Sequence, residues 1–200
     1  MRFDQPAYTP DHFTHEVWVR CPKCGQRGQV ITQRDPETKR QLPATARFVC
    51  TQCPHTLSAP KKWEGYVYEY TAAPCHHCGN PIQYCGEPTR KPAAQKRLTC
   101  GVCGTEALVP LQSREHLGRF AQDPRFGLAL WLQIIVHGET LWLYNLEHLA
   151  YLRAYVAASV REAPDRHKYS IITNLPQFVK AAKHRDVIVR KLDALAAQYR

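Results

Sequence analysis

Eight of the nine cysteines form four Cys-x-x-Cys pairs, and no other pattern in the chain is as well suited to chemistry. The pairs are Cys21/Cys24, Cys50/Cys53, Cys75/Cys78 and Cys100/Cys103. A two-residue gap lets one tight turn aim two thiolates at one ion, and Zn²⁺ prefers four soft ligands in a tetrahedron. The sequence therefore predicts two structural Zn²⁺ ions, each held by four cysteines.

The four pairs can combine in more than one way. In chain order, the first pair joins the second and the third joins the fourth; a cross-braced arrangement, in which the first and third pairs share an ion, stays open. An internal repeat favours chain order, because residues 47–53 match residues 97–103. Disulfides are a further alternative. Since no apolar segment follows Met1, we expect a reducing, cytoplasmic location in which metal binding is favoured.

Strands and tight turns must position these cysteines. Residues 15–20 and 65–71 read as strands that lead into the first and third pairs. Gly25, Gly79 and Gly104 each follow a pair, where glycine accepts a left-handed backbone and leaves amides free to donate to sulfur. Pro54 stands at the corresponding place after the second pair, so amide-to-sulfur bonds are expected to be weaker there.

On these residues, the segment 17–110 resembles the zinc-ribbon group, in which two Cys-x-x-Cys turns on β-hairpins hold one zinc ion. The resemblance rests on the eight cysteines together with Pro22 and the three glycines. It implies two metal-binding β-ribbons in tandem. It implies no single activity, because ribbons bind DNA, RNA or other proteins. Residues 175–183 are also similar to the tails of small, uncharacterised bacterial zinc-ribbon proteins, and this likeness carries no activity.

Cysteine is absent after residue 103, and apolar runs begin beyond residue 114. We predict an α+β fold with four segments: an irregular arm 1–16, zinc ribbon 1 at 17–72, zinc ribbon 2 at 73–113, and a C-terminal ββαα unit at 114–200. Within that unit, residues 128–136 and 141–144 predict a hairpin. Asn145 is expected to cap a helix that ends near Glu162. A short helix after Pro176 and another over residues 186–198 complete the unit.

The chain is basic, with a net charge of +10, and residues 161–191 contain eight basic residues against three acidic ones. Such a surface favours polyanions such as DNA or RNA, although a merely solvated surface is an equal alternative. Lys180 and Lys183 are three residues apart and are expected to share a helix face. The candidate phosphate contacts are Lys180, Lys183, Arg185, Arg190, Lys191, Arg34, Lys39 and Arg40.

Two further functions are alternatives. One is a protein-interaction adaptor that docks through its ribbons and its apolar hairpin, with Trp131, Trp142 and Tyr144 as anchors. The other is an enzyme. The chain shows no glycine-rich phosphate loop, nucleophile elbow or paired carboxylates, so we expect a non-enzymatic protein. Cys85 is left over as a plain thiol or a substitute ligand, and His148 lacks the second histidine of a metalloprotease motif.

Partners are constrained by the same composition. No apolar run approaches the roughly 18 residues that span a bilayer, so no membrane partner is expected. Neither is a small-molecule substrate evident. Nucleic acid is the expected partner, with a protein partner as the alternative, in an accessory subunit of a larger complex.

Overall fold

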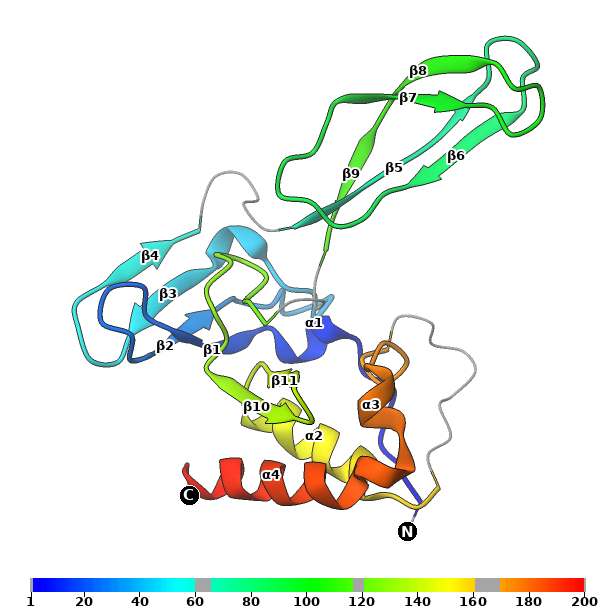
Figure 1. The fold of residues 1–200 in the computed structure, drawn as a ribbon. Coiled ribbons are helices and arrows are strands. Elements are labelled where there is room, and N and C mark those ends of the chain that lie inside the picture. Colours follow the sequence, from blue (N-terminus) through cyan, green and yellow to red (C-terminus); the bar gives the residue numbers. More distant parts are fainter. Residues whose placement is uncertain (1, 60–65, 117–120, 161–169, 200) are drawn as a thin grey trace. The chain divides into compact units, whose positions relative to one another are not determined.

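Short antiparallel strands and four α-helices make up the fold in the computed structural model, which describes residues 2–59, 66–116, 121–160 and 170–199 (Figure 1). The predicted α+β class is confirmed. The chain divides into two compact units: the first contains Met1–Lys61 and Phe120–Arg200, and the second contains Lys62–Arg119. No helix among the described residues is long and apolar enough to cross a membrane.

The first unit contains a four-stranded antiparallel sheet in the order β1-β2-β3-β4. Its strands are β1 (Glu16–Arg20), β2 (Arg27–Ile31), β3 (Arg47–Cys50) and β4 (Thr56–Ser58). Val30 of β2 pairs with Val17 on one side and with Phe48 on the other. All three side chains are fully buried, so the register places one apolar face of the sheet in the core.

The other edge of β1 is also occupied. The Trp18 amide donates to the Tyr144 carbonyl at 2.8 Å, and the Trp131 amide donates to the Trp18 carbonyl at 2.8 Å. Val17, Trp18 and Val19 are all buried, so both faces of β1 are covered by the core. The first ribbon and the C-terminal residues therefore share one core.

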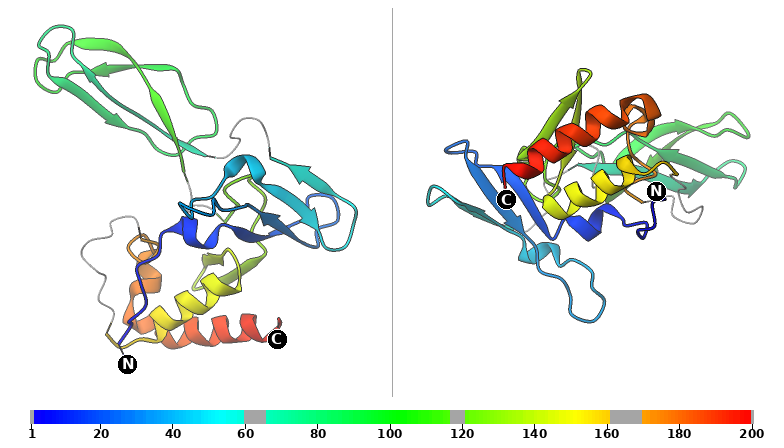
Figure 2. Two further views of the ribbon diagram at one scale, coloured as in Figure 1. Left: turned by 180° about the vertical axis from the view of Figure 1, so that it is seen from behind. Right: turned by 90° about the horizontal axis from the view of Figure 1, so that it is seen from below.

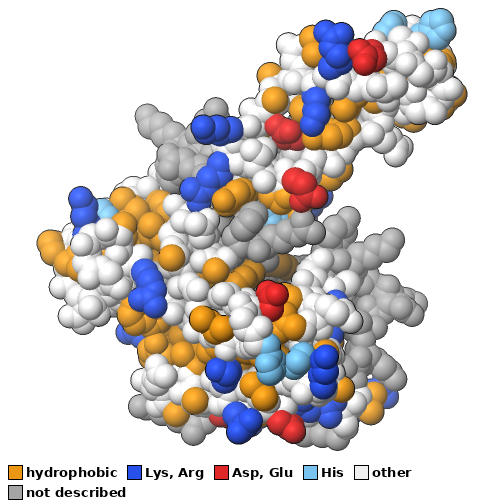
Figure 3. All heavy atoms as spheres, viewed as in Figure 1, with side chains coloured by type: hydrophobic (Ala, Val, Ile, Leu, Met, Phe, Trp, Pro, Cys, Tyr) orange, Lys and Arg blue, Asp and Glu red, His pale blue; other side chains and the backbone are white. Residues whose placement is uncertain are grey.

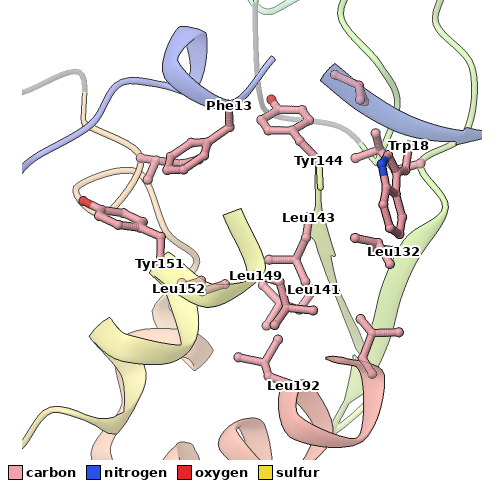
Figure 4. Packing of buried hydrophobic residues seen from close by; sticks show 14 of the residues in the cluster. Phe13, Trp18, Leu132, Leu141, Leu143, Tyr144, Leu149, Tyr151, Leu152 and Leu192 are labelled. Atoms are coloured by element: carbon pink, nitrogen blue, oxygen red, sulfur yellow. The ribbon is translucent and has the colours of Figure 1, made fainter. Parts of the chain in front are cut away.

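This organisation differs from the predicted segments 17–72 and 114–200, which placed the first ribbon and the C-terminal unit apart. Backbone bonding along β1 is the physical reason, because it makes the ribbon and the later chain one hydrogen-bonded structure. The arm 1–16 is not wholly irregular either. It contains α1 (Pro10–Phe13), and Phe13 is fully buried (Figure 4).

A hairpin and three helices complete the first unit. Strands β10 (Leu132–Val136) and β11 (Glu139–Leu143) are joined by His137 and Gly138, both with positive φ (50° and 85°), as a tight two-residue hairpin turn requires. The first strand is shorter than predicted, because the residues before it bridge to β1 instead: Leu130 pairs with Val19.

The helices are α2 (Leu146–Ala157), α3 (Gln177–Lys180) and α4 (Arg185–Ala197). Helix α2 ends before the predicted boundary at Glu162, which lies outside the described residues. Helices α2 and α4 lie side by side (Figure 2), and the Arg153 guanidinium on α2 donates to the Asp193 carboxylate on α4. Leucines from α2, α4, β10 and β11 fill the space between them (Figure 4).

Asn145 joins three parts of the first unit through one side chain. Its Oδ1 accepts from the His148 amide at 2.9 Å and caps α2, which confirms the predicted cap. Its Nδ2 donates to the carbonyls of Phe13 (2.9 Å) and Glu16 (2.8 Å). The N-terminal segment is thereby tied to the start of α2.

We expect Asn145→Ala to lower the free energy of unfolding by about 2–4 kcal/mol, because a helix cap and two buried donors are lost together. Urea denaturation followed by circular dichroism measures this loss. Asn145→Asp is the matched variant: it keeps the cap acceptor but places a carboxylate against the two carbonyls. If alanine and aspartate were both tolerated without loss, the side chain would not hold the N-terminal segment in place.

The second unit has a much smaller core. Strands β5 (Val67–Pro74), β6 (Pro81–Cys85) and β9 (Gln112–Glu115) form a sheet in the order β6-β5-β9. Strands β7 (Gln95–Thr99) and β8 (Glu106–Pro110) form a separate hairpin. Its buried hydrophobic cluster, among the described residues, consists of Cys75, Ile82, Cys100 and Val109. Because half of it is cysteine, apolar burial contributes little to its stability.

Candidate metal centres

The first tetrad comprises Cys21, Cys24, Cys50 and Cys53, whose sulfur atoms all lie within 4.8 Å of one another. Cys21 follows β1 directly and Cys50 is the last residue of β3, so the sheet register brings the two turns together. The Sγ–Sγ distances are 3.7 Å for Cys21–Cys53 and 3.5 Å for Cys24–Cys50. A disulfide has an S–S distance of about 2.05 Å. These cysteines are therefore free thiols arranged around one point.

The second tetrad comprises Cys75, Cys78, Cys100 and Cys103, again within 4.8 Å. Cys75 follows β5 and Cys100 follows β7. The Sγ–Sγ distances are 3.7 Å for both Cys75–Cys103 and Cys78–Cys100. Both tetrads take their pairs in chain order, so the cross-braced alternative is not the arrangement found.

The turns have the predicted geometry where glycine is present. In the first turn the Cys21 amide donates to the Gln26 carbonyl at 2.7 Å, and the Gly25 amide donates to the Cys21 carbonyl at 2.9 Å. Gly25 has φ 71°, a left-handed backbone that favours glycine, and Gly79 and Gly104 have φ 73°. The Lys23 amide also donates to Cys21 Sγ at 3.4 Å.

The turn with Pro54 behaves differently from the prediction. The amides of Gln52 and Cys53 both donate to Cys50 Sγ at 3.4 Å, so amide-to-sulfur bonding is kept. The predicted weakening was wrong because these donors lie inside the Cys-x-x-Cys turn. What proline removes is only an amide at position 54, since proline has no N–H.

These hydrogen bonds favour thiolates. The Gln52 amide, together with that of Cys53, lowers the pKa of Cys50 to about 6. In the second tetrad, hydrogen bonds from Thr105 lower the pKa of Cys103 to about 6. Each tetrad thus contains a cysteine whose pKa is lowered by hydrogen bonds, which favours the thiolate form that binds metals.

The remaining cysteine and the turn histidines lie outside the tetrads. Cys85 is an exposed free thiol at the end of β6 and belongs to neither group. His76 and His77 lie exposed between Cys75 and Cys78 and do not take the place of a sulfur.

The predicted phosphate contacts are spread over several elements of the first unit. Lys180 ends α3, and its Nζ donates to the Thr173 carbonyl at 2.8 Å. Lys183 lies in the 3-10 helix η2 (Ala182–His184), after Ala181 with an extended backbone (ψ 124°). The prediction that Lys180 and Lys183 share one helix face was wrong, because α3 stops after four residues.

The other candidates lie on α4 and on the segment between β2 and β3. Arg185 begins α4, and Arg190 and Lys191 are exposed on it. Arg34 donates to the His12 carbonyl, whereas Lys39 and Arg40 are exposed. Figure 3 shows Lys and Arg side chains interspersed with apolar and neutral surface rather than gathered in one continuous patch.

Arg20 and Arg27 were not singled out by the sequence patterns. The Arg20 guanidinium lies 4.7 Å from the ring centroid of Trp131, and that of Arg27 lies 4.4 Å from the ring centroid of Trp18. The residues pair with each other across β1 and β2. The available signal was that Arg20 ends a predicted strand that contains Trp18. The partner of Arg20 could not be predicted, because Trp131 is more than a hundred residues away in the chain.

No protein-family model, curated protein or solved structure matches this chain. The structure alone therefore defines the class of the protein: it is an α+β protein with two groups of four cysteines, each close enough to hold a metal ion.

Proposed function

We propose that each tetrad holds one structural Zn²⁺ ion, and that the chain binds nucleic acid through phosphate contacts as a non-enzymatic, accessory subunit of a larger complex. Zinc is supported by the ligand set and by its spacing. A tetrahedron with Zn–S bonds of about 2.3 Å places its sulfurs about 3.8 Å apart. The nearest sulfurs here are separated by 3.5–3.7 Å.

A structural role follows from the same chemistry. Four thiolates complete the coordination of Zn²⁺, so no position is left for water or substrate. Cys75 and Cys100 are also half of the buried hydrophobic cluster of the second unit. An ion there would supply stability that apolar packing does not.

Nucleic acid is favoured by the charge of the chain. The net charge is +10, and Lys183, Arg190 and Lys191 are exposed around α4, where the only acidic residues are Asp186 and Asp193. Asp193 is already paired with Arg153 on α2. Within the described parts of the chain, Lys183, Arg190 and Lys191 form no ion pair. Exposed cations of this kind favour phosphate binding, and this excess is the observation that carries the proposal.

Fluorescence anisotropy with generic DNA and RNA tests it. Affinity is expected to fall on the order of a hundredfold between 50 and 200 mM salt, as phosphate contacts dictate. Lys183→Gln and Arg190→Gln should each weaken binding, and the loss should be the same for all nucleic-acid sequences. Asp186→Asn is the control with the opposite expected effect: removing an acidic group beside these cations should raise the affinity for nucleic acid. An absence of binding at low salt would rule the proposal out.

An adaptor function is the second candidate, favoured by exposed apolar residues. In the second unit Val102 is 70 % exposed and Leu108 is 61 % exposed, and Ile135 on β10 is 63 % exposed. Of the predicted anchors, Tyr144 is fully buried and cannot serve. Capture of one stoichiometric protein that survives nuclease treatment, and that is lost in Leu108→Glu, would favour this function over nucleic-acid binding.

A further inference from the structure

An open cavity of about 360 Å³ lies in the first unit beside the first tetrad, between the end of β1, the start of β10 and the last turns of α4. Cationic, aromatic and amide side chains line it, chiefly Arg20, Lys191, Trp131, Tyr199, Gln133 and Gln198. Its volume is within the range of sites for small organic ligands. No acidic residue is among the described side chains that form its wall.

The aromatic groups of this cavity are held rigidly. Trp131 Nε1 donates to the Tyr199 hydroxyl at 2.5 Å, which fixes both rings. The Tyr199 ring in turn packs edge-on against Trp18, with centroids 5.1 Å apart. Rigid rings offer flat surfaces for stacking at a low entropic cost.

The cations around the cavity are held close together although they repel. Arg20 and Arg27 are directly opposite in the pairing of β1 with β2, an arrangement that destabilises a sheet when both residues carry the same charge. Each guanidinium lies over a tryptophan ring rather than beside a carboxylate. Among the described residues, Arg20, Arg27 and Lys191 form no ion pair. A ligand that brings negative charge would relieve this repulsion.

We infer that this cavity binds one nucleotide of a single-stranded nucleic acid. The base stacks against the planar groups that line the cavity, namely the rings of Trp131 and Tyr199 and the Arg20 guanidinium that lies over Trp131, and the flanking phosphates lie against Arg20, Arg27 and Lys191. The amides of Gln133 and Gln198 can hydrogen-bond the edge of a base. Aromatic rings and arginine planes are the surfaces on which unpaired bases stack. The inference rests on the proposed function: it specifies single-stranded nucleic acid as the ligand and this cavity as the binding site.

The test uses the full, metal-loaded chain and two fluorescein-labelled 12-mers, oligothymidine and an abasic strand with the same phosphates. Stacking is expected to make the thymidine strand bind at least about fivefold tighter. Arg20→Gln should abolish that difference. Arg190→Gln is the matched control: it removes one cation from α4 outside the cavity, so it should weaken both strands equally. Metal content of two ions per chain and unchanged circular dichroism confirm that each variant is folded.

A second experiment locates the bound nucleic acid on the protein without measuring affinity. Photocrosslinking with 5-iodouracil strands should label a peptide that contains Trp131 or Tyr199. Labelling confined to the second unit, or an Arg20→Gln variant no weaker than Arg190→Gln, would overturn the cavity while leaving nucleic-acid binding intact. Failure of both strands to bind at low salt would instead overturn the proposed function. Displacement of the strand by micromolar thymidine monophosphate would show that the ligand is a free nucleotide rather than a strand.

Discussion

Replacing Cys100 with serine is expected to unfold the second unit while the first unit stays folded. Cys100 is 1 % exposed and belongs to the four-residue buried hydrophobic cluster of that unit. The variant loses a proposed zinc ligand and a core side chain together. Zinc binding by four thiolates is worth about 10–16 kcal/mol in small zinc-dependent modules, far more than this core supplies. The first unit has 27 buried residues in its own core and does not depend on that ion.

Hydrogen exchange and native mass spectrometry measure this outcome. Amides of β5 to β8 should lose protection, those of β1, β2 and α2 should keep it, and the metal content should fall from two ions to one. Cys85→Ser is the matched control, because Cys85 is exposed and lies outside both tetrads. That variant should retain two ions and full protection. If Cys100→Ser kept the protection of β7 and β8, metal binding would not be what folds the second unit.

Acidification is expected to destabilise the first unit through His148. This side chain is 2 % exposed, and its ring stacks on Phe13 with centroids 4.8 Å apart. Its Nδ1 accepts from the Tyr144 amide at 3.2 Å, which leaves the proton of the neutral ring on Nε2. Burial lowers the pKa of His148 from 6.5 to about 3.

The direction of the effect follows from proton uptake. Between pH 6.5 and 3 the unfolded chain binds a proton at this position and the folded chain does not, so stability falls as the pH falls. The slope is about 1.4 kcal/mol per pH unit, or about 3 kcal/mol between pH 6.5 and 4. Above pH 6.5 the histidine is neutral in both states and contributes no pH dependence.

His148→Phe separates this contribution from acid release of the metal, because both chains carry the same tetrads. At pH 7 the variant should be about 1 kcal/mol less stable than the parent, since the Tyr144 amide loses its acceptor. At pH 4 it should be the more stable of the two. His148→Asn, which offers an acceptor but does not titrate, should likewise gain stability relative to the parent as the pH falls from 7 to 4. Parallel stability curves for all three chains from pH 7 to 4 would contradict the buried, neutral histidine.

The members of both tetrads could be predicted from the sequence because the geometry of a Cys-x-x-Cys turn is local. Each Cys-x-x-Cys turn needs only five or six residues, so Gly25 and Gly104 were readable signals. The hairpin of β10 and β11 and the cap at Asn145 were likewise set by neighbouring residues. The turn before Pro54 is also local: the amides of Gln52 and Cys53, inside the turn, donate to Cys50 Sγ.

What the sequence did not reveal depends on contacts between distant residues. Residues 15–20 were predicted as a strand, but the sequence did not indicate that Tyr144 and Trp131 occupy its second edge. The stacking of Arg20 on Trp131 has the same origin. Helix α3 also ended early, which separated Lys180 from Lys183, because tertiary packing rather than local preference decides such short helices.

The pairing of β5 with β9 makes the second unit an insertion in a chain that is otherwise continuous. Val67 lies directly opposite Glu115, so the polypeptide departs and returns at neighbouring backbone positions, about 5 Å apart. A unit whose first and last strands pair with each other closes its own fold, so it does not need the host's strands to complete its sheet. The chain is therefore modular by topology, with one cysteine tetrad in the inserted unit and the other set in the core of its host.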